Sequence, residues 1–371
     1  MERRAGRRMV LLIALALIIA ACTASPETAD DQGESEVTAG QTSDSSEGGD
    51  TAAGDFSDAP AVEIVFGHPF PAEHHLVVNV LQPWMDDVTA RTDGTVTFDV
   101  QPGGALTGPA DAYEHPAAGV TDMGWALHGY TPGRFPLTEV VELPFLFDSA
   151  VQGTETLWDL YEGFDALQEE YSDTHVLALW THDVGDLFTT EQPVRSASDV
   201  AGLNIRTPAP MQNNLIEALG GSAVGMPAPE LYDALDRGVI DGLMIGHSGI
   251  PTFNLQEVLG TVTRGNFFVG TMFLVMNPQT WESMSPAQQA VFDETANRTL
   301  SVALAEDMDR VGEEAASQFE TWGFEITELD DAALEEWRAA TEQVPQQWID
   351  AQAADVPAQE MYDQVSQAAG G

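Results

Sequence analysis

The segment between Gly202 and Gly246 constrains the fold of this chain most strongly, because strand and helix patterns alternate in it at short intervals. The expected elements, in chain order, are a strand at 203–206, a helix at 211–219, a strand at 223–226, a helix at 229–237 and a strand at 239–245. This order implies parallel strands joined by right-handed crossovers. The segment therefore predicts an α/β fold.

Similar alternation on both sides of this segment predicts further elements. They are strands at 62–66, 96–100, 176–180 and 324–326, and helices at 74–89, 157–167 and from 331 onward. Ser285 and Pro286 form a helix start, and apolar residues recur at helical spacing up to Trp322, before Gly323. An unbroken helix of about 37 residues would reach roughly 55 Å, so we expect it either to break or to span two lobes.

The N-terminus has the pattern of a secretion signal. Met1–Arg8 carries four arginines, and residues 9–21 form one apolar run before Cys22. A bilayer-spanning helix needs about 20 apolar residues, so this shorter run predicts a cleaved signal peptide over residues 1–21. The residues before Cys22 resemble the lipobox of bacterial lipoproteins, which implies acylation of Cys22. The alternative is that Cys22 is only an apolar residue of the signal.

Residues 22–60 are rich in Ser, Thr, Gly, Ala, Asp and Glu and have almost nothing large to bury. Such a composition cannot form a core and predicts a disordered acidic tether. About 311 residues remain, which is more than one core usually spans, so two lobes are expected. Cys22 is the only cysteine, and no disulfide within the chain is possible.

The charge balance excludes several partners. Without residues 1–21 the chain has nine arginines, no lysine and 59 acidic side chains, a net charge of about −50. Phosphate backbones and anionic lipid surfaces would repel such a chain, so nucleic acid is not an expected partner. A dense carboxylate surface is also consistent with high external salt.

Several segments match one family in order and spacing. They are FPLTEVVELPFLF at 135–147, DVAGLNIRTP at 199–208, MPAPELYDALDRGVIDG at 226–242 and Met276-Asn277. The chain resembles the DctP-type solute receptors of TRAP transporters from Ala61 to the C-terminal helix. The resemblance implies a periplasmic-binding-protein-like fold of the type II class, with two lobes of mixed sheets, a hinge, and a long helix that spans both lobes.

Family membership also implies the domain plan and the function. The first lobe is expected to comprise 61–183 with 274–312, and the second 184–273 with 313–371 and the C-terminal helices. The expected protein is extracytoplasmic, lies at the outer face of the membrane or in the periplasm, and is not an enzyme. It would need no cofactor or metal, would capture a small organic acid between the lobes, and would deliver it to a small DctQ-type and a large DctM-type membrane subunit.

Arg206, in the G-L-x-I-R-T-P motif, is the position that pairs with the ligand carboxylate in this family. The chemistry of arginine supports this role, because a guanidinium offers a planar fork of donors to a carboxylate and keeps its charge when desolvated. A strongly anionic chain can hold an anion only with a fixed local cation. The alternative is an ordinary ion pair, since acidic side chains outnumber arginines severalfold.

The resemblance carries over to further positions less closely. The remaining candidates for the ligand site are His68, Trp125, His128, Tyr130, Phe188 and His247. The alternative for each of them taken alone is a packed core residue or a histidine with an ordinary partner. Segment 185–190 lacks the second arginine of sialic acid receptors, and Leu243-Met244-Ile245 replaces the frequent Q-E-N. Together these residues predict an aromatic, imidazole-lined pocket with one cation, suited to a monocarboxylate with an apolar or aromatic body.

Three other functions fit the sequence less well. A lipid-anchored hydrolase is disfavoured because Ile250 replaces the second glycine of G-x-S-x-G in residues 246–250. A metal-capturing receptor could use His68, His74 and His75 with Glu73, but the chain has no H-E-x-x-H motif and no cysteine partner. A tethered adhesion protein would lack a cleft and ligand-induced stabilisation.

Overall fold

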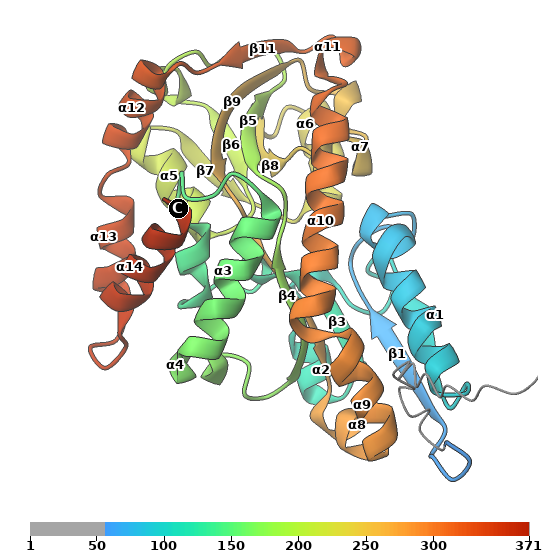
Figure 1. Cartoon of the computed structure of the whole chain (residues 1–371). Helices are drawn as coiled ribbons and strands as arrows, with labels where there is room; N and C mark the ends of the chain where they lie inside the picture. Colours follow the sequence, from blue (N-terminus) through green and yellow to red (C-terminus); the bar gives the residue numbers. More distant parts are fainter. Residues whose placement is uncertain (1–55, 371) are drawn as a thin grey trace, which may run out of the picture. The chain divides into compact units, whose positions relative to one another are not determined.

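The computed structural model describes residues 56–370, which lie within one compact unit, Ala52–Gly371. Cys22, the predicted signal peptide and nearly all of the predicted tether fall outside the described residues. The described strands form two mixed sheets of five and six strands, with helices packed around them (Figure 1). This confirms the predicted two-lobed α/β fold. No helix among residues 56–370 is long and apolar enough to cross a membrane.

The sheet of the first lobe has the strand order β2-β1-β3-β10-β4. Its strands are β1 (Val62–Gly67), β2 (Val96–Gln101), β3 (Met123–Leu127), β4 (His175–Thr181) and β10 (Thr271–Met276). β1 runs parallel to β2 and β3, whereas β10 is antiparallel to β3 and β4. β10, which follows both β3 and β4 at a distance in the sequence, lies between them and joins β4 to the rest of the sheet.

The sheet of the second lobe has the order β11-β9-β5-β8-β6-β7. Its strands are β5 (Gly185–Thr189), β6 (Asn204–Thr207), β7 (Ser222–Gly225), β8 (Gly242–Gly246), β9 (Thr261–Phe268) and β11 (Glu325–Glu328). β6 pairs in parallel with both β7 and β8, so the predicted βαβαβ unit is confirmed. The carboxyl ends of these three strands meet at one edge, which is where ligands bind in open α/β sheets.

The helices follow the predicted spacing in most places. The described α-helices are α1 (Gln82–Arg91), α2 (Glu114–Ala118), α3 (Ala150–Gly163), α4 (Asp165–Glu169), α5 (Pro210–Ala218), α6 (Leu231–Asp236), α7 (Gly249–Thr252), α8 (Pro278–Ser283), α9 (Pro286–Thr295), α10 (Asn297–Ala316), α11 (Phe319–Trp322), α12 (Asp331–Ala340), α13 (Val344–Ala351) and α14 (Ala358–Ala369). A π-helical turn, η1 (Val77–Leu81), precedes α1, and short 3₁₀ turns are η2 (Pro109–Asp111), η3 (His128–Tyr130), η4 (Thr138–Glu142), η5 (Ala197–Val200), η6 (Ala228–Glu230) and η7 (Leu255–Glu257).

The predicted long helix both breaks and spans the lobes. Ser285 caps α9 through a reciprocal capping box with Gln288, as the sequence indicated. The break falls at Asn297, whose φ of 57° is incompatible with a continuous helix. Beyond it, α10 packs beside β4 and α3 and then reaches α7, while Phe319 of α11 joins a core of the second lobe (Figure 1).

Besides α10 and the link from α12 to α13, two chain segments that lie close together connect the lobes. Residues 182–184 join β4 to β5, and residues 269–270 join β9 to β10. The backbone N–H of His182 donates to the carbonyl of Gly270 at 2.9 Å, so the two connections lie side by side. They form the predicted hinge region.

The C-terminal helices divide between the cores. Trp337 of α12 packs in a core cluster of the second lobe, whereas Trp348 of α13 and Met361 of α14 belong to the core cluster of the first lobe. The sequence analysis assigned residues 313–371 to the second lobe. In the structure α13 and α14 pack on the first lobe instead. The residue boundaries of the lobes otherwise stay a prediction.

Candidate functional site

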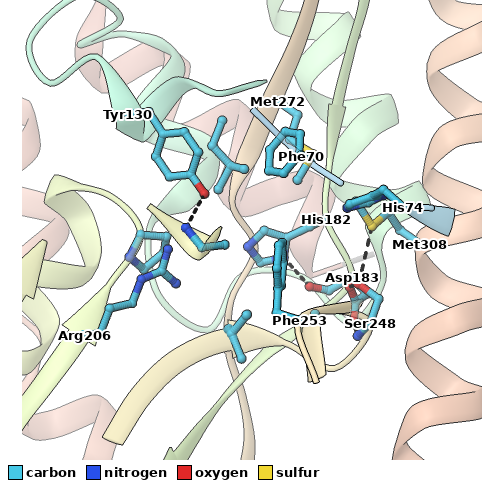
Figure 2. Close-up of a pocket in the computed structure, with 16 residues that line it drawn as sticks. Phe70, His74, Tyr130, His182, Asp183, Arg206, Ser248, Phe253, Met272 and Met308 are labelled. Carbon is cyan, nitrogen blue, oxygen red and sulfur yellow. Dashed lines mark hydrogen bonds between the residues drawn. The ribbon is translucent and has the colours of Figure 1, made fainter. Parts of the chain in front are cut away.

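A small cavity of about 40 Å³ lies where the two lobes and the hinge meet (Figure 2). It is lined by Phe70, His74, Leu127, Tyr130, His182, Asp183, Arg206, Pro208, Ala228, Ile245, Gly246, Ser248, Gly249, Phe253, Met272 and Met308. These residues come from the segment after β1, from the ends of β3, β6 and β8, from η3, η6 and the region of α7, from the hinge, and from β10 and α10. Most of the wall is apolar, with a few polar groups converging on it, which is the usual composition of a small-molecule site.

Arg206 projects into this cavity from β6, which lies between β7 and β8 in the sheet. Its side chain is 1% exposed. Nε donates to the carbonyl of Met226 at 2.9 Å and Nη1 donates to the carbonyl of Met244 at 3.0 Å. These two bonds hold the plane of the guanidinium fixed.

No carboxylate among residues 56–370 forms an ion pair with Arg206. Seven other arginines do have such partners, namely Arg91, Arg134, Arg195, Arg237, Arg264, Arg298 and Arg310. Arg338 is exposed and lies over the ring of Phe145. Burial lowers the pKa of Arg206, since desolvation disfavours its charge, but a guanidinium stays protonated at neutral pH. The site therefore holds a buried cation without a partner anion.

Tyr130 of the first lobe faces Arg206 and bridges to the second lobe (Figure 2). Its hydroxyl accepts a hydrogen bond from the backbone N–H of Ala228 at 2.9 Å. Burial raises the pKa of Tyr130, and the neighbouring guanidinium opposes that rise. Tyr130 thus remains a neutral phenol that connects the lobes beside the cation.

The hinge supplies two polar groups to the cavity wall. Nδ1 of His182 is bonded to the backbone carbonyl of Asp183 at 2.5 Å. The Asp183 carboxylate accepts bonds from the Ser248 backbone N–H at 3.0 Å and hydroxyl at 2.5 Å. A Cβ on Gly246 or on Gly312 of α10 would approach the Asp183 carboxylate to within 2.6 and 2.5 Å. Asp183 therefore bonds the hinge to the segment after β8 and packs closely against Gly246 of β8 and Gly312 of α10.

Aromatic rings form the wall on the side of the first lobe. The ring of Phe70 lies 5.3 Å from that of His74, and Phe253 of the second lobe lies 6.3 Å from His74. Trp125 lies behind them, 4.4 Å from Phe70 and 5.1 Å edge-on to His74. Such a wall favours a flat or apolar ligand body over a polyol.

A larger cavity of about 220 Å³ adjoins the first and shares Tyr130 and Pro208 with it. The residues that line it are Gly129, Tyr130, Pro132, Pro208, Ala209, Pro210, Asn213, Gly225, Met226 and Pro227. It lies between η3 of the first lobe and the carboxyl ends of β6 and β7. The Tyr130–Ala228 hydrogen bond lies where the two cavities meet.

Of the seven residues predicted for the ligand site, the structure brings Arg206 and Tyr130 together in this cavity. Trp125 and His68 lie in the core behind it, where their rings are 5.1 Å apart. His128 is bonded through Nε2 to the Tyr171 hydroxyl at 2.8 Å, and burial lowers its pKa to about 3. None of these three core residues lines the cavity.

His247 and Phe188 also lie away from the cavity, in the second lobe. Nε2 of His247 pairs with Asp186 at 2.8 Å. Although burial disfavours its charge, the bond to Asp186 raises the pKa of His247. The ring of Phe188 lies 6.1 Å edge-on to His247 and packs against Phe319. For these two residues, as for the three core residues above, a role as ligand contacts stays a prediction.

The prediction missed several lining residues, among them Phe70, His74, His182, Phe253 and Met308. One signal existed, since His182 lies two residues after the buried-type run 176–180 and strand ends often carry site residues. Met308 had no local signal, because its helix reaches the cavity only through tertiary packing. Within residues 56–370 no cluster of three or more His, Cys, Asp or Glu side chains is arranged to hold a metal ion.

The family model described as bacterial extracellular solute-binding protein, family 7 (DctP), matches residues 66–352. A TRAP periplasmic solute-binding protein from Bordetella bronchiseptica with bound (R)- and (S)-mandelate is 29% identical, with a TM-score of 0.78, covering 83% of this chain and 99% of that one.

Two further solved structures have similar scores. One is a marine metagenome TRAP solute-binding protein described as specific for aromatic acid ligands, in complex with metahydroxyphenylacetate. It is 28% identical, with a TM-score of 0.79, covering 83% of this chain and 98% of that chain. The other is a TRAP solute-binding protein from Rhodoferax ferrireducens with benzoate. It is 25% identical, with a TM-score of 0.79 and the same coverage.

Proposed function

The chain belongs to the DctP family of bacterial extracellular solute-binding proteins, and on this premise we propose that it captures a small aromatic carboxylate and delivers it to a TRAP transporter. Proteins of this family are substrate receptors rather than catalysts. The observation that carries the proposal is the buried Arg206, which has no carboxylate partner among residues 56–370.

A buried cation without a counter-ion is costly, because its hydration is lost and the two backbone carbonyls that Arg206 contacts replace only part of it. Seven arginines of the described part have acidic partners, so the absence of one at Arg206 is not due to a shortage of carboxylates. A ligand carboxylate would supply the missing charge and accept hydrogen bonds from the guanidinium edge. Binding would then relieve a cost that the empty site carries.

The rest of the cavity favours an aromatic body. Phe70, Phe253 and the face of Tyr130 surround the space beside the cation. Three similar receptors hold mandelate, metahydroxyphenylacetate and benzoate. A planar ring attached to a carboxylate would contact the aromatic wall while its charge meets Arg206. Contacts to both lobes would shift the protein toward the closed arrangement that the membrane subunits recognise.

A panel of organic acids tests this function. Thermal unfolding should shift upward with aromatic monocarboxylates such as benzoate, phenylacetate and mandelate, because ligands that bind the native state stabilise it by mass action. Sugar acids such as galacturonate and dicarboxylates such as succinate should shift it less. A protein stabilised only by sugars or metal ions would contradict the proposal.

We also propose that acylation at Cys22 anchors the receptor to the membrane through the tether. Metabolic labelling with a fatty acid should mark the wild-type chain and not a Cys22→Ala variant. Release of the variant from the membrane fraction is the second expected result. Equal membrane association of both chains without label would contradict the anchor and leave the ligand site unaffected.

A further inference from the structure

His182, at the hinge, is held in one tautomer by its neighbour. The partner of Nδ1 is the backbone carbonyl of Asp183, which can only accept, so Nδ1 must carry the proton. Burial lowers the pKa of His182, which keeps the ring neutral at physiological pH. Nε2 is therefore an unprotonated acceptor, and no group among residues 56–370 donates to it.

No hinge side chain covers Nε2 of His182, because the hinge residue beside it is Gly270. A Cβ on Gly270 would lie 2.6 Å from this nitrogen, so any larger residue at that position would block it. The ring itself lines the cavity and lies between Arg206 and Asp183 (Figure 2). The His182 side chain is only 6% exposed and lines the cavity, and its Nε2 acceptor has no donor among residues 56–370.

His74, on the opposite side of the cavity, is held in the opposite tautomer. Its Nδ1 accepts a hydrogen bond from the backbone N–H of Leu76 at 3.2 Å, so Nδ1 is unprotonated. Burial, with the nearby His75, lowers the pKa of His74 and keeps its ring neutral, which places the proton on Nε2. His74 is thus a donor, and no acceptor for its Nε2–H lies among residues 56–370.

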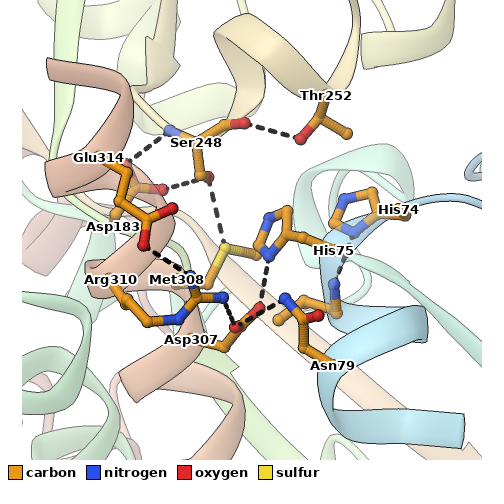
Figure 3. A network of polar contacts seen from close by, with 11 residues as sticks. His74, His75, Asn79, Asp183, Ser248, Thr252, Asp307, Met308, Arg310 and Glu314 are labelled. Atoms are coloured by element: carbon orange, nitrogen blue, oxygen red, sulfur yellow. Dashed lines mark hydrogen bonds and ion pairs between the residues drawn. The ribbon is translucent and has the colours of Figure 1, made fainter. Parts of the chain in front are cut away.

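Hydrogen bonds to Asp307 of α10 hold the element that carries His74 in place. His75, the next residue, pairs with Asp307 of α10 at 2.6 Å, and Asn79 donates to the same carboxylate at 3.0 Å (Figure 3). Arg310 of α10 also pairs with Asp307. Because this network fixes the start of the helix, His74 presents its ring to the cavity in a defined orientation.

We infer that the ligand is a hydroxylated acid, whose hydroxyl donates to Nε2 of His182 and whose oxygens accept from Nε2–H of His74, while its carboxylate meets Arg206. This inference rests on the proposed function and narrows its ligand class. A buried acceptor left without a donor is costly, so the cavity discriminates against acids that lack the hydroxyl. A ring hydroxyl or an α-hydroxyl both meet this requirement.

Matched ligand pairs test the inference directly. We would measure by calorimetry the affinities for mandelate against phenylacetate, 3-hydroxybenzoate against benzoate, and lactate against propionate. In at least one pair the hydroxylated member should bind tighter by about tenfold or more, since sites built for a hydroxyl reject analogues without it. Equal affinity within every pair, or preference for the unhydroxylated acid, overturns the inference.

A variant of His182 assigns the preference to its acceptor. In His182→Phe a planar ring stays in place while both ring nitrogens, and with them the Nε2 acceptor, are removed. The preference for the hydroxylated acid should disappear. His182→Leu serves as a second variant if the phenyl ring disturbs the hinge, and preference retained in both contradicts the inference.

The matched control is His175→Phe. The ring of His175, at the start of β4, stacks on Trp281 at 3.8 Å and does not line the cavity. This variant should keep the hydroxyl preference of the wild type. Its loss here too would mean that general disturbance of the core, and not the His182 acceptor, sets the preference.

Nitrogen-15 NMR of labelled histidines gives a readout that needs no ligand. His182 should show protonated Nδ1 and bare Nε2, and His74 the reverse. The opposite assignment at His182 would overturn the inference. Binding that requires Arg206 but ignores the hydroxyl would contradict this inference alone, whereas no binding of any acid would contradict the proposed function as well.

Discussion

The hydroxyl of Tyr130 in the first lobe accepts a hydrogen bond from the backbone N–H of Ala228 in the second lobe, at 2.9 Å. This bond lies beside the buried Arg206 and between the two adjoining cavities. A single side chain therefore links closure of the lobes to the place where the carboxylate is expected.

Tyr130→Phe should weaken closure while it keeps the aromatic ring in place. Loss of one hydrogen bond of about 1 kcal/mol would lower the apparent affinity for the acid about fivefold, because less of the protein adopts the closed state. Calorimetry gives the affinity, and small-angle scattering should show an expanded ligand-free form. The control is Tyr232→Phe, which removes a bond to Glu257 within the second lobe. Equal effects of both variants would contradict the role of Tyr130 in closure.

Gly312→Ala should destabilise the hinge. The new methyl group would lie 2.5 Å from Oδ2 of Asp183, which must then leave its bonds to Ser248. Overpacking of this kind costs about 1–3 kcal/mol in the free energy of unfolding, measured by urea titration. Gly163→Ala, at the end of α3 with no atom within 4 Å of the new Cβ, should change it by less than about 0.5 kcal/mol. Similar free energies of unfolding for the two variants would show that Asp183 is not tightly packed against Gly312.

Glu142 should make the first lobe more stable at mildly acidic pH. Its Oε1 accepts from the backbone N–H of Thr271 at 2.8 Å, but Oε2 has no partner among residues 56–370. Burial raises the pKa of Glu142 from 4.5 to about 7. Because the folded state holds the proton more tightly, its contribution is complete below pH 4.5 and is lost as the pH rises through 7.

Glu142→Gln should remove this pH dependence, since the amide cannot ionise. Between pH 5.5 and 8 the wild type should lose about 2 kcal/mol more unfolding free energy than the variant. Glu63→Gln changes the same charge at an exposed position of β1 and should leave the pH profile of the wild type intact. If the unfolding free energies of the wild type and Glu142→Gln changed with pH in parallel, the prediction that folded Glu142 keeps its proton at mildly acidic pH would be contradicted.

Periodicity was sufficient to predict the elements that lie close together in sequence. The strands and helices of residues 203–246 were predicted within a few residues, because each buries one face and has a short connection. The helix at 74–89 was only partly right. Pro83 lacks an N–H, and the structure has a π-helical turn over Val77–Leu81 before α1 begins.

The site could be predicted only in part. Arg206 followed from its motif, but which face of a strand or loop a neighbour presents depends on long-range packing. His247 and Ser248 illustrate this, because adjacent side chains point in different directions. Ser248 reaches the cavity, while His247 turns to Asp186 in the core. His68 and Phe70 differ in the same way, and only Phe70 lines the cavity.

The central claim is that Arg206 is the cation that holds the ligand carboxylate. We would measure by calorimetry the affinity of wild type, Arg206→Lys, Arg206→Ala and the control Arg338→Ala for the tightest aromatic acid of the panel. The account predicts wild-type affinity for Arg338→Ala, at least about tenfold weaker binding for Arg206→Lys because a point charge lacks the guanidinium fork, and no detectable binding for Arg206→Ala. Wild-type affinity in a folded Arg206→Ala protein would contradict it.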